Sequence, residues 1–250
     1  MKVAVVTPYF REPLPVLRRC HESVLGQTSP VTHVLVSDGA PQAAINGWDA
    51  QHILLARRHG DHGNTPRAIG AMSALNQGYD AVAFLDADNW YADDHIASLA
   101  ALCAQTNVAA AFSYRHLVLT SGEVCPFRSQ EDLDDSHVDT SCMLITRRAA
   151  FLLPMWAMMD PKLAPIGDRV MLAIIRKTGV PHGWTRKATL FYETNLPIHY
   201  AAMGKEPPAA PRGVDWDEMK RHIASSRDTM IDRLGFDPLT PREGVSREPL

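Results

Sequence analysis

Short apolar runs alternate with helix-like segments along the first part of the chain. The apolar runs fit strands that are buried on both faces, and they cover residues 2–6, 33–37, 52–56 and 81–85. Residues 14–25 and 66–77 between them fit helices, and a glycine follows each segment, at Gly26 and Gly78. The alternation predicts an α/β fold with a mostly parallel sheet flanked by helices.

The pattern is less regular after residue 93. We predict helices over residues 94–104, 147–159 and 168–177, and strands over 108–113, 116–120 and 138–145. The acidic stretch 131–135 contains few apolar side chains, so we expect a solvated, mobile loop there.

Prolines cluster over residues 204–213, so we expect the apolar core to end near Met203. We divide the chain into one α/β domain over residues 1–203 and a C-terminal part over 204–250. The second part would hold a Pro-rich linker, an amphipathic helix over 215–234 and a loose tail.

Composition and charge narrow the possible partners. The 250 residues include 25 Lys and Arg against 28 Asp and Glu, a net charge of −3, and no stretch gathers the basic residues that a nucleic acid needs. No segment reaches the roughly 18 apolar residues of a membrane span, and the run over 3–6 is too short for a signal peptide. We expect a cytoplasmic protein without a transmembrane segment and with four reduced core thiols.

Three predicted strands end in polar residues. These ends are Thr7-Pro8, Asp38-Gly39 and Asp86-Ala87-Asp88. Because the carboxyl ends of parallel strands meet at one edge of a sheet, we expect the three ends to line a ligand crevice.

Asp86 and Asp88 form the one Asp-x-Asp pair, of three in the chain, that directly follows a buried strand. Two carboxylates at the mouth of a crevice repel each other unless a cation or hydrogen-bond donors compensate. A divalent metal is the simplest compensation, and it would take substrate phosphates as further ligands. The alternative is a pair of aspartates that caps the helix beginning near Asp93.

The chain resembles the family 2 glycosyltransferases, which have the GT-A fold. The resemblance rests on four motifs in the family's order: Val6-Thr-Pro-Tyr9, Ser23-Val-Leu-Gly-Gln-Thr28, Ser37-Asp-Gly39 and Phe84-Leu-Asp-Ala-Asp-Asn89. Weaker similarities continue to about His199. The resemblance implies a GT-A domain over 1–203, a nucleotide-diphosphate sugar in the crevice and Mn²⁺ or Mg²⁺ on the Asp-x-Asp motif.

The resemblance also assigns nucleotide-binding residues. Thr7, Pro8 and Tyr9 resemble the turn that packs on the nucleoside, and Asp38 resembles the aspartate that accepts a hydrogen bond from the base, which favours UDP. Asp86 resembles the carboxylate on the ribose or metal side. The alternatives are a strand that simply ends at proline and a turn carboxylate beside a glycine.

Further residues would bind phosphate and metal. Arg67 lies in a segment that contains Gly and Asn and begins a helix, where it could bind phosphate or ribose oxygens. The usual Ala-Arg-Asn-x-Gly motif of the family is not present in this segment. Asp88 is the stronger candidate for direct metal coordination. His199 resembles the histidine that completes the metal site in some members, and a nitrogen ligand would favour manganese. Trp90, Tyr91 and Trp184 are candidate sugar platforms.

Asp168 stands where the resemblance places the general base of an inverting transfer. Gly167 replaces the first acid of the family's acid pair. The alternative for Asp168 is a helix N-cap, and Asp139 is a second candidate for the base.

These observations predict a metal-dependent, inverting glycosyltransferase that moves a sugar from a nucleotide-diphosphate donor to an acceptor hydroxyl. One alternative is a GT-A-fold protein that binds nucleotides and has lost turnover, because an acid is missing at Gly167. A sugar nucleotidyltransferase is disfavoured, since no Gly-rich loop follows the first strand. We expect residues 114–137 and the C-terminal part to shape the acceptor site.

Overall fold

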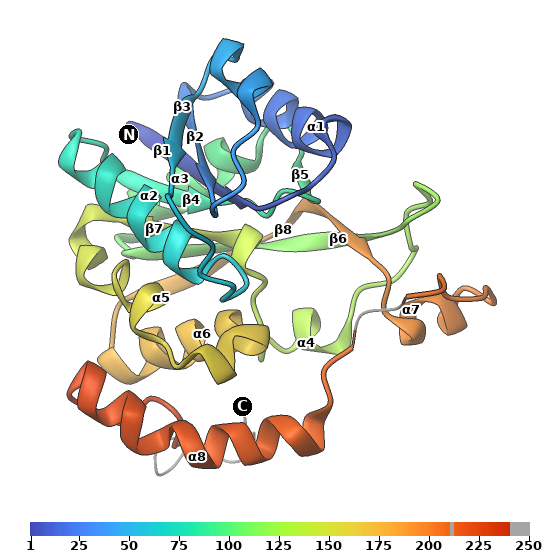
Figure 1. Ribbon diagram of the computed structural model, residues 1–250. Coiled ribbons are helices and arrows are strands. Elements are labelled where there is room, and N and C mark those ends of the chain that lie inside the picture. The colour runs from blue at the N-terminus through green and yellow to red at the C-terminus, as the bar shows by residue number, and fades with distance from the viewer. Residues whose placement is uncertain (211–212, 241–250) are drawn as a thin grey trace.

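The computed structural model describes residues 1–210 and 213–240, which form one eight-stranded sheet covered by helices on both faces (Figure 1). The strand order is β3-β2-β1-β4-β7-β6-β8-β5. The parallel part consists of β1 (Val3–Tyr9), β2 (Val31–Ser37), β3 (Gln51–Leu54) and β4 (Ala81–Phe84). These strands coincide with the four apolar runs, so the predicted parallel sheet is confirmed.

The second half of the sheet mixes directions. β7 (Met143–Thr146) is antiparallel to β4 and to β6 (Ala110–Leu119). β8 (His182–Thr194) runs parallel to β6, and the short edge strand β5 (Trp90–Tyr91) pairs antiparallel with it. The two strands predicted over 108–113 and 116–120 are one strand, β6, whose pairing with β8 shifts register around Tyr114.

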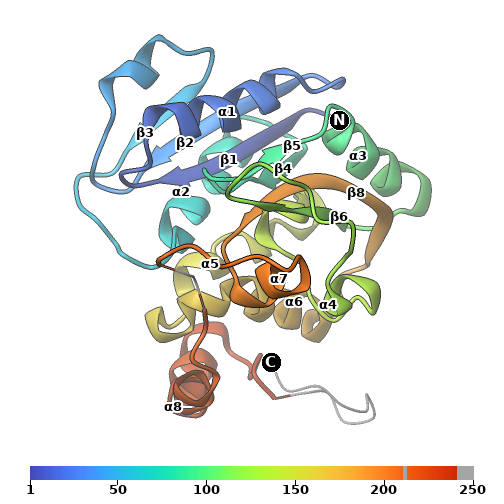
Figure 2. The same ribbon diagram turned by 90° about the vertical axis from the view of Figure 1, so that its right-hand side faces the viewer.

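Helices cover the two faces of the sheet unequally. α1 (Leu14–Leu25) and α3 (His95–Thr106) lie on one face (Figure 2). α2 (Asn64–Asn76) lies on the other, with α5 (Met155–Met158) and α6 (Gly167–Thr178) beyond it. The remaining short elements are α4 (Gln130–Leu133), α7 (Pro197–Ala202) and the 3-10 turns η1 (Ala43–Gly47), η2 (Thr140–Cys142), η3 (Arg147–Leu152) and η4 (Pro161–Ile166).

The predicted helix over residues 147–159 is interrupted. It consists of η3 and α5, with Leu153 and Pro154 between them. Proline has no N–H to donate to the preceding turn, so a continuous helix cannot form through this position.

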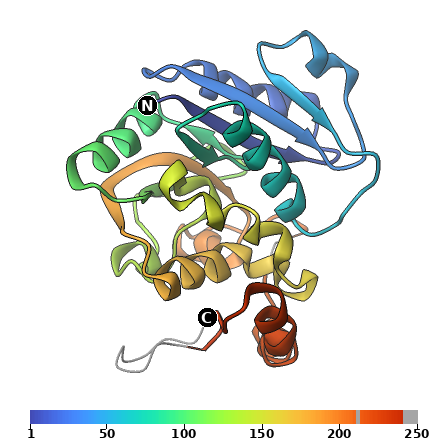
Figure 3. The ribbon, with the colours of Figure 1, turned by 90° about the vertical axis from the view of Figure 1, so that its left-hand side faces the viewer.

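The apolar core extends further along the chain than Met203. α8 (Trp216–Leu234) lies beneath η4 and α5, where Met219 and Met230 are buried in the main core cluster (Figures 1 and 3). Arg233 of α8 also donates to the carbonyl oxygens of Met158 and Met159. The C-terminal helix is therefore packed against the rest of the domain.

The cysteines and the hydropathy of the helices concern two further predictions. All four cysteines are buried free thiols, as predicted. None of the helices in the described ranges combines the length and the apolar character needed to cross a lipid bilayer.

Candidate active site

The three polar strand ends meet at one edge of the sheet. β1 lies between β2 and β4, so the Asp38 N–H donates to Tyr9 O at 2.7 Å on one side, and the Leu85 N–H donates to Val6 O at 3.1 Å on the other. The side chains at the end of β1, Asp38 and Asp86 therefore share one edge. The predicted convergence of the strand ends is confirmed.

Thr7, Pro8 and Tyr9 are the last residues of strand β1 and not the turn that we expected, because they continue the parallel pairing with β2. Thr7 is fully buried, and its Oγ1 lies 2.9 Å from His33 Nε2. Tyr9 is also buried, with its hydroxyl 2.6 Å from His52 Nε2. Thr7 and Tyr9 thus anchor the end of β1 to the neighbouring strands, and Pro8 lies against the loop at Gly63.

Asp38 is tied to a loop that crosses the end of β2. Its Oδ1 accepts the His59 N–H at 2.9 Å and lies 2.8 Å from His59 Nδ1, while Oδ2 accepts the Gly60 N–H at 3.2 Å. Gly39 has φ +79°, and a Cβ there would lie 2.4 Å from Arg58 N. The close approach of this loop therefore requires glycine. A carboxylate offers about four acceptor sites, so Asp38 has capacity for one more donor.

Arg67 pairs with Asp86 inside the protein. The guanidinium is buried, donating through Nη2 to Asp86 Oδ1 and through Nη1 to His62 O at 2.8 Å and Asn64 Oδ1 at 3.2 Å. Its cation also lies over the Trp156 ring, 5.4 Å from the centroid. The structure thus places Arg67 as the partner of Asp86 rather than as an exposed phosphate ligand.

The loop that carries Asp88 is held by groups that the sequence did not single out. Ser141 Oγ accepts the Asp86 N–H and the Asn89 Nδ2–H, both at 3.1 Å. Arg19 donates to Asp88 O at 2.7 Å and to Glu193 Oε2 at 3.0 Å. These bonds fix the backbone around the half-buried Asp88.

His199 does not join the two aspartates. Its Nδ1 lies 2.8 Å from Thr194 Oγ1, and burial lowers its pKa, with the positive charge of Arg115 acting in the same direction. Within the ranges that the structure covers, no three His, Cys, Asp or Glu side chains gather as a metal site. The expected site of Asp86, Asp88 and His199 is therefore not formed by the protein alone.

The residues present fit a metal that the substrate helps to hold. Mg²⁺ and similar hard cations are commonly bound by one or two carboxylates, and water and substrate phosphates complete the coordination. Since Arg67 already neutralises Asp86, Asp88 is the stronger ligand candidate.

A second cluster of charges surrounds Asp168 at the first turn of α6. Asp168 Oδ2 lies 2.7 Å from His137 Nε2, and its side chain is 22% exposed. Ile166 occupies the N-cap position of α6, so the alternative reading of Asp168 as the N-cap is wrong. Burial raises the pKa of Asp168, but His137 and Arg169 outweigh it and bring the pKa to about 2.

Asp139 links the two clusters electrostatically. Burial raises its pKa to about 6, with the negative charges of Asp86 and Asp168 acting in the same direction and Arg115 and His137 opposing them. Asp139 Oδ1 accepts the N–H of Ser141, whose Oγ accepts the Asp86 N–H, and Asp139 Oδ2 lies 3.4 Å from Arg115 Nη1. Asp139 therefore joins the Asp-x-Asp loop to the cluster around Asp168.

The acidic stretch 131–135 is not the solvated loop that we expected. Asp132 in α4 is buried, 3.3 Å from Arg115 Nε, and Glu131 pairs with Arg169. Asp135 accepts a hydrogen bond from Tyr114 at 2.9 Å. The sequence did contain a signal that this acidic stretch is buried. Arg115 lies in the middle of the apolar strand β6, and a buried arginine requires carboxylate partners.

Gly167 faces the side chain of Asn64. A Cβ at Gly167 would lie 3.1 Å from both Asn64 Nδ2 and Oδ1. The space next to the missing acid is therefore occupied by an amide from the first turn of α2.

The three candidate sugar platforms differ in their surroundings. Tyr91 is buried and donates to Phe84 O at 2.5 Å, so it belongs to the core. Trp184 packs edge-on against Phe112, 4.9 Å between centroids. Trp90 is half-buried close to Asp88, and the Arg19 cation lies 4.1 Å from its ring centroid.

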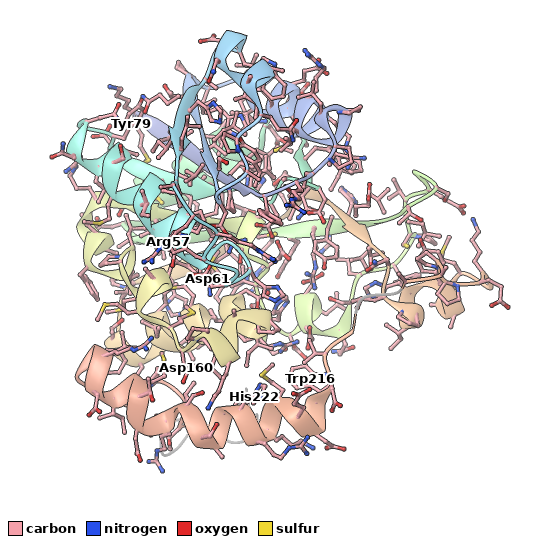
Figure 4. The ribbon with its side chains drawn as sticks, viewed as in Figure 1. Arg57, Asp61, Tyr79, Asp160, Trp216 and His222 are labelled. Carbon is pink, nitrogen blue, oxygen red and sulfur yellow. The ribbon has the colours of Figure 1, made fainter. Side chains whose placement is uncertain are left out.

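A pocket of about 410 Å³ lies between the loop after β3 and α8. Figure 4 shows this region, with Asp61 above it and Asp160, Trp216 and His222 below. Its lining comes from the loop, from η4 and from the start of α8, and includes His62, Lys162, Asp215 and His222. The C-terminal part therefore reaches the loop that holds Asp38.

Comparison with known structures shows a shared fold. S. aureus TarS 1–349 in complex with UDP-GlcNAc aligns with a TM-score of 0.62 at 13% identity, covering 94% of this chain and 68% of that chain. The same fragment in complex with UDP aligns with a TM-score of 0.58 at 13% identity, over 94% and 71%. A longer S. aureus TarS chain gives 0.57 at 13% identity, over 81% of this chain and 38% of that one.

Sequence comparison identifies the family. A comparison with curated proteins finds no significant match. The model of "Glycosyl transferase family 2" matches residues 4–151, more than half of the chain, and includes all four motifs at the strand ends and the first helix. The chain, with its GT-A fold, therefore belongs to glycosyl transferase family 2.

Proposed function

We propose that this glycosyltransferase moves a sugar from a nucleotide-diphosphate donor, UDP-sugar being favoured, to an acceptor hydroxyl, with inversion and with Mn²⁺ or Mg²⁺. The observation that carries the proposal is the run of hydrogen bonds that joins the two candidate residues. The Asp86 N–H donates to Ser141 and the Ser141 N–H donates to Asp139, while Arg115 and His137 link Asp139 to Asp168. This link supports a metal-side carboxylate and a base in one site. The similarity in fold to TarS bound to UDP-GlcNAc supports the donor class.

In this proposal Asp88 holds the metal, together with the donor's phosphates, and Arg67 keeps Asp86 in place. When bound, the metal would neutralise the charge that develops on the leaving diphosphate. Both Mg²⁺ and Mn²⁺ accept such oxygen ligands.

Asp168 is the proposed general base. It would accept the proton of the acceptor hydroxyl while that oxygen bonds to the anomeric carbon and the bond to the nucleoside diphosphate breaks. Attack opposite the leaving group inverts the anomeric centre. Asp38 and the end of β1 at Thr7, Pro8 and Tyr9 would bind the nucleoside.

We place the acceptor near α4 and the C-terminal part. The support is the packing of α8 on the domain and the pocket that it forms with the loop of His62. The buried free thiols fit a reducing compartment such as the cytoplasm. The charge balance and the absence of a basic stretch support a small-molecule donor rather than a nucleic acid.

One other function is favoured by a specific observation. Asn64 fills the space beside Gly167 where the family has an acid, which suits a protein that binds nucleotides without turnover. Calorimetric titration with UDP and GDP, with and without Mn²⁺, followed by donor-hydrolysis and transfer assays, separates the two. Metal-dependent binding with neither hydrolysis nor transfer to any acceptor would overturn the enzymatic proposal.

A further inference from the structure

His137 hydrogen-bonds the proposed base from a buried position. Its Nε2 lies 2.7 Å from Asp168 Oδ2, and the side chain is 6% exposed. The other ring nitrogen, Nδ1, lies 3.3 Å from Arg115 Nη2. A guanidinium can only donate, so Nδ1 accepts and Nε2 carries the proton that is donated to Asp168.

Arg115 is itself fixed by two carboxylates. Its Nε faces Asp132 Oδ2 at 3.3 Å and its Nη1 faces Asp139 Oδ2 at 3.4 Å. All three side chains are buried, and they come from β6, from α4 and from the residue before η2. The donor that faces His137 therefore has little freedom to move.

The remaining charged groups around His137 are on the neighbouring elements. Glu131 of α4 lies 3.7 Å from His137 Nδ1, beyond hydrogen-bond distance, and pairs with Arg169 of α6. Arg169 also donates its backbone N–H to Asp168 Oδ1 at 2.7 Å. Each oxygen of Asp168 thus has one donor.

We propose that His137, oriented by Arg115, is a positioning residue for sugar transfer. Its Nε2–H holds Asp168 as an ionised carboxylate in one orientation, ready to accept the proton of the acceptor hydroxyl. The inference rests on the proposed function for Asp168 as base. His137 is not the base itself, because both of its ring nitrogens are engaged.

The first test needs no activity. We would label histidine with ¹⁵N in the full chain and record the ring-nitrogen chemical shifts at neutral pH, assigning His137 by comparison with the His137→Gln variant. The inference requires a protonated Nε2 and an unprotonated Nδ1. A proton on Nδ1 with a bare Nε2 would overturn it, whatever the enzyme does.

The second test compares variants in a transfer assay. Leucine at position 137 removes both hydrogen bonds, whereas glutamine can still accept from Arg115 and donate to Asp168. We expect His137→Leu to lower kcat about 100-fold, the size of a general-base contribution, with the KM of the donor unchanged. We expect His137→Gln to recover about a tenth or more of the wild-type kcat, because it retains a donor to Asp168.

The pH profile separates positioning from a general structural role. The hydrogen bond from His137 Nε2–H helps to hold the pKa of Asp168 at about 2, so its loss should move the acid limb of kcat upward, towards the ordinary range of a carboxyl group. His182→Gln is the matched control, since this half-buried histidine lies at the opposite end of β8 from the site, and its acid limb should not move.

The outcomes are distinguishable. Equal losses in the leucine and glutamine variants, with unchanged acid limbs, would overturn the positioning role. If His137→Leu does not fold, the nitrogen shifts and the His137→Gln profile decide the inference. If the wild-type protein transfers no sugar, the proposed function fails, while the nitrogen shifts still show whether the hydrogen bond to Asp168 exists.

Discussion

Arg67 donates to Asp86 Oδ1 from a buried position and joins the first turn of α2 to the residues that follow β4. Arg67 thus supplies one positive charge to a loop that contains two aspartates, Asp86 and Asp88. Asp86 is therefore neutralised by the protein, which is why the proposed metal site uses Asp88 as its ligand.

Replacing Asp88 with asparagine should abolish metal-dependent activity without unfolding the protein. Because a bound metal contributes several kcal/mol to a phosphate leaving group, we expect transfer to fall by about 10³-fold. Calorimetry should also show that Mn²⁺ no longer strengthens UDP binding. Asp94→Asn, at an exposed position six residues along the chain, is the control. An unchanged response of Asp88→Asn to Mn²⁺ would exclude the metal assignment.

Removing the guanidinium of Arg67 should destabilise the fold. Arg67→Met leaves the charge of Asp86 without its partner, so we expect the free energy of unfolding to fall by about 2–4 kcal/mol. Asp86→Asn should cost less, because the asparagine oxygen can still accept from Arg67, whereas Arg67→Met also removes the donors to His62 O and Asn64 Oδ1. Urea denaturation of both single variants and of the double variant measures the coupling. Strictly additive losses would show that the pair contributes nothing.

The contact between Gly167 and Asn64 can be tested with small side chains. Gly167→Ala should lower the free energy of unfolding by about 1 kcal/mol, since the new methyl group meets the Asn64 amide. In an Asn64→Ala background, the same change should cost little. Thermal melts of the four proteins check this non-additivity, and an equal cost in both backgrounds would contradict it.

Asp139 should make stability depend on pH. Its pKa rises from about 3.8 in the unfolded chain to about 6 in the fold, so the fold favours the neutral acid. The associated stability is complete below pH 3.8 and is lost as the pH rises through 6.

Asp139→Asn should therefore be more stable than the wild type at pH 7, by at most about 3 kcal/mol, and similar to it near pH 4. The asparagine oxygen can still accept the Ser141 N–H. Denaturation at the two pH values measures the difference, with the exposed Asp217→Asn as control. A difference that does not change with pH would contradict the expected ionisation.

Local sequence patterns were enough to predict the parallel half of the sheet and the edge at which its polar strand ends meet. The apolar runs of β1, β2 and β4 and the polar residues after them are local patterns, and the parallel arrangement then requires Asp38 and Asp86 to meet at one edge. The four family motifs lie in the same part of the chain, within residues 4–151.

The pairing of charges could not be predicted in this way, because it depends on how separate elements pack. His137 and Asp168 are 31 residues apart, and Arg115 on β6 pairs with Asp132 in α4 and with Asp139 before η2. The same holds for Arg67, whose partner Asp86 is 19 residues away. The periodicity of a sequence indicates which side of a helix or strand is apolar. A buried charge, however, is neutralised by a side chain of another element, and the packing of the elements determines which side chain comes within hydrogen-bond distance.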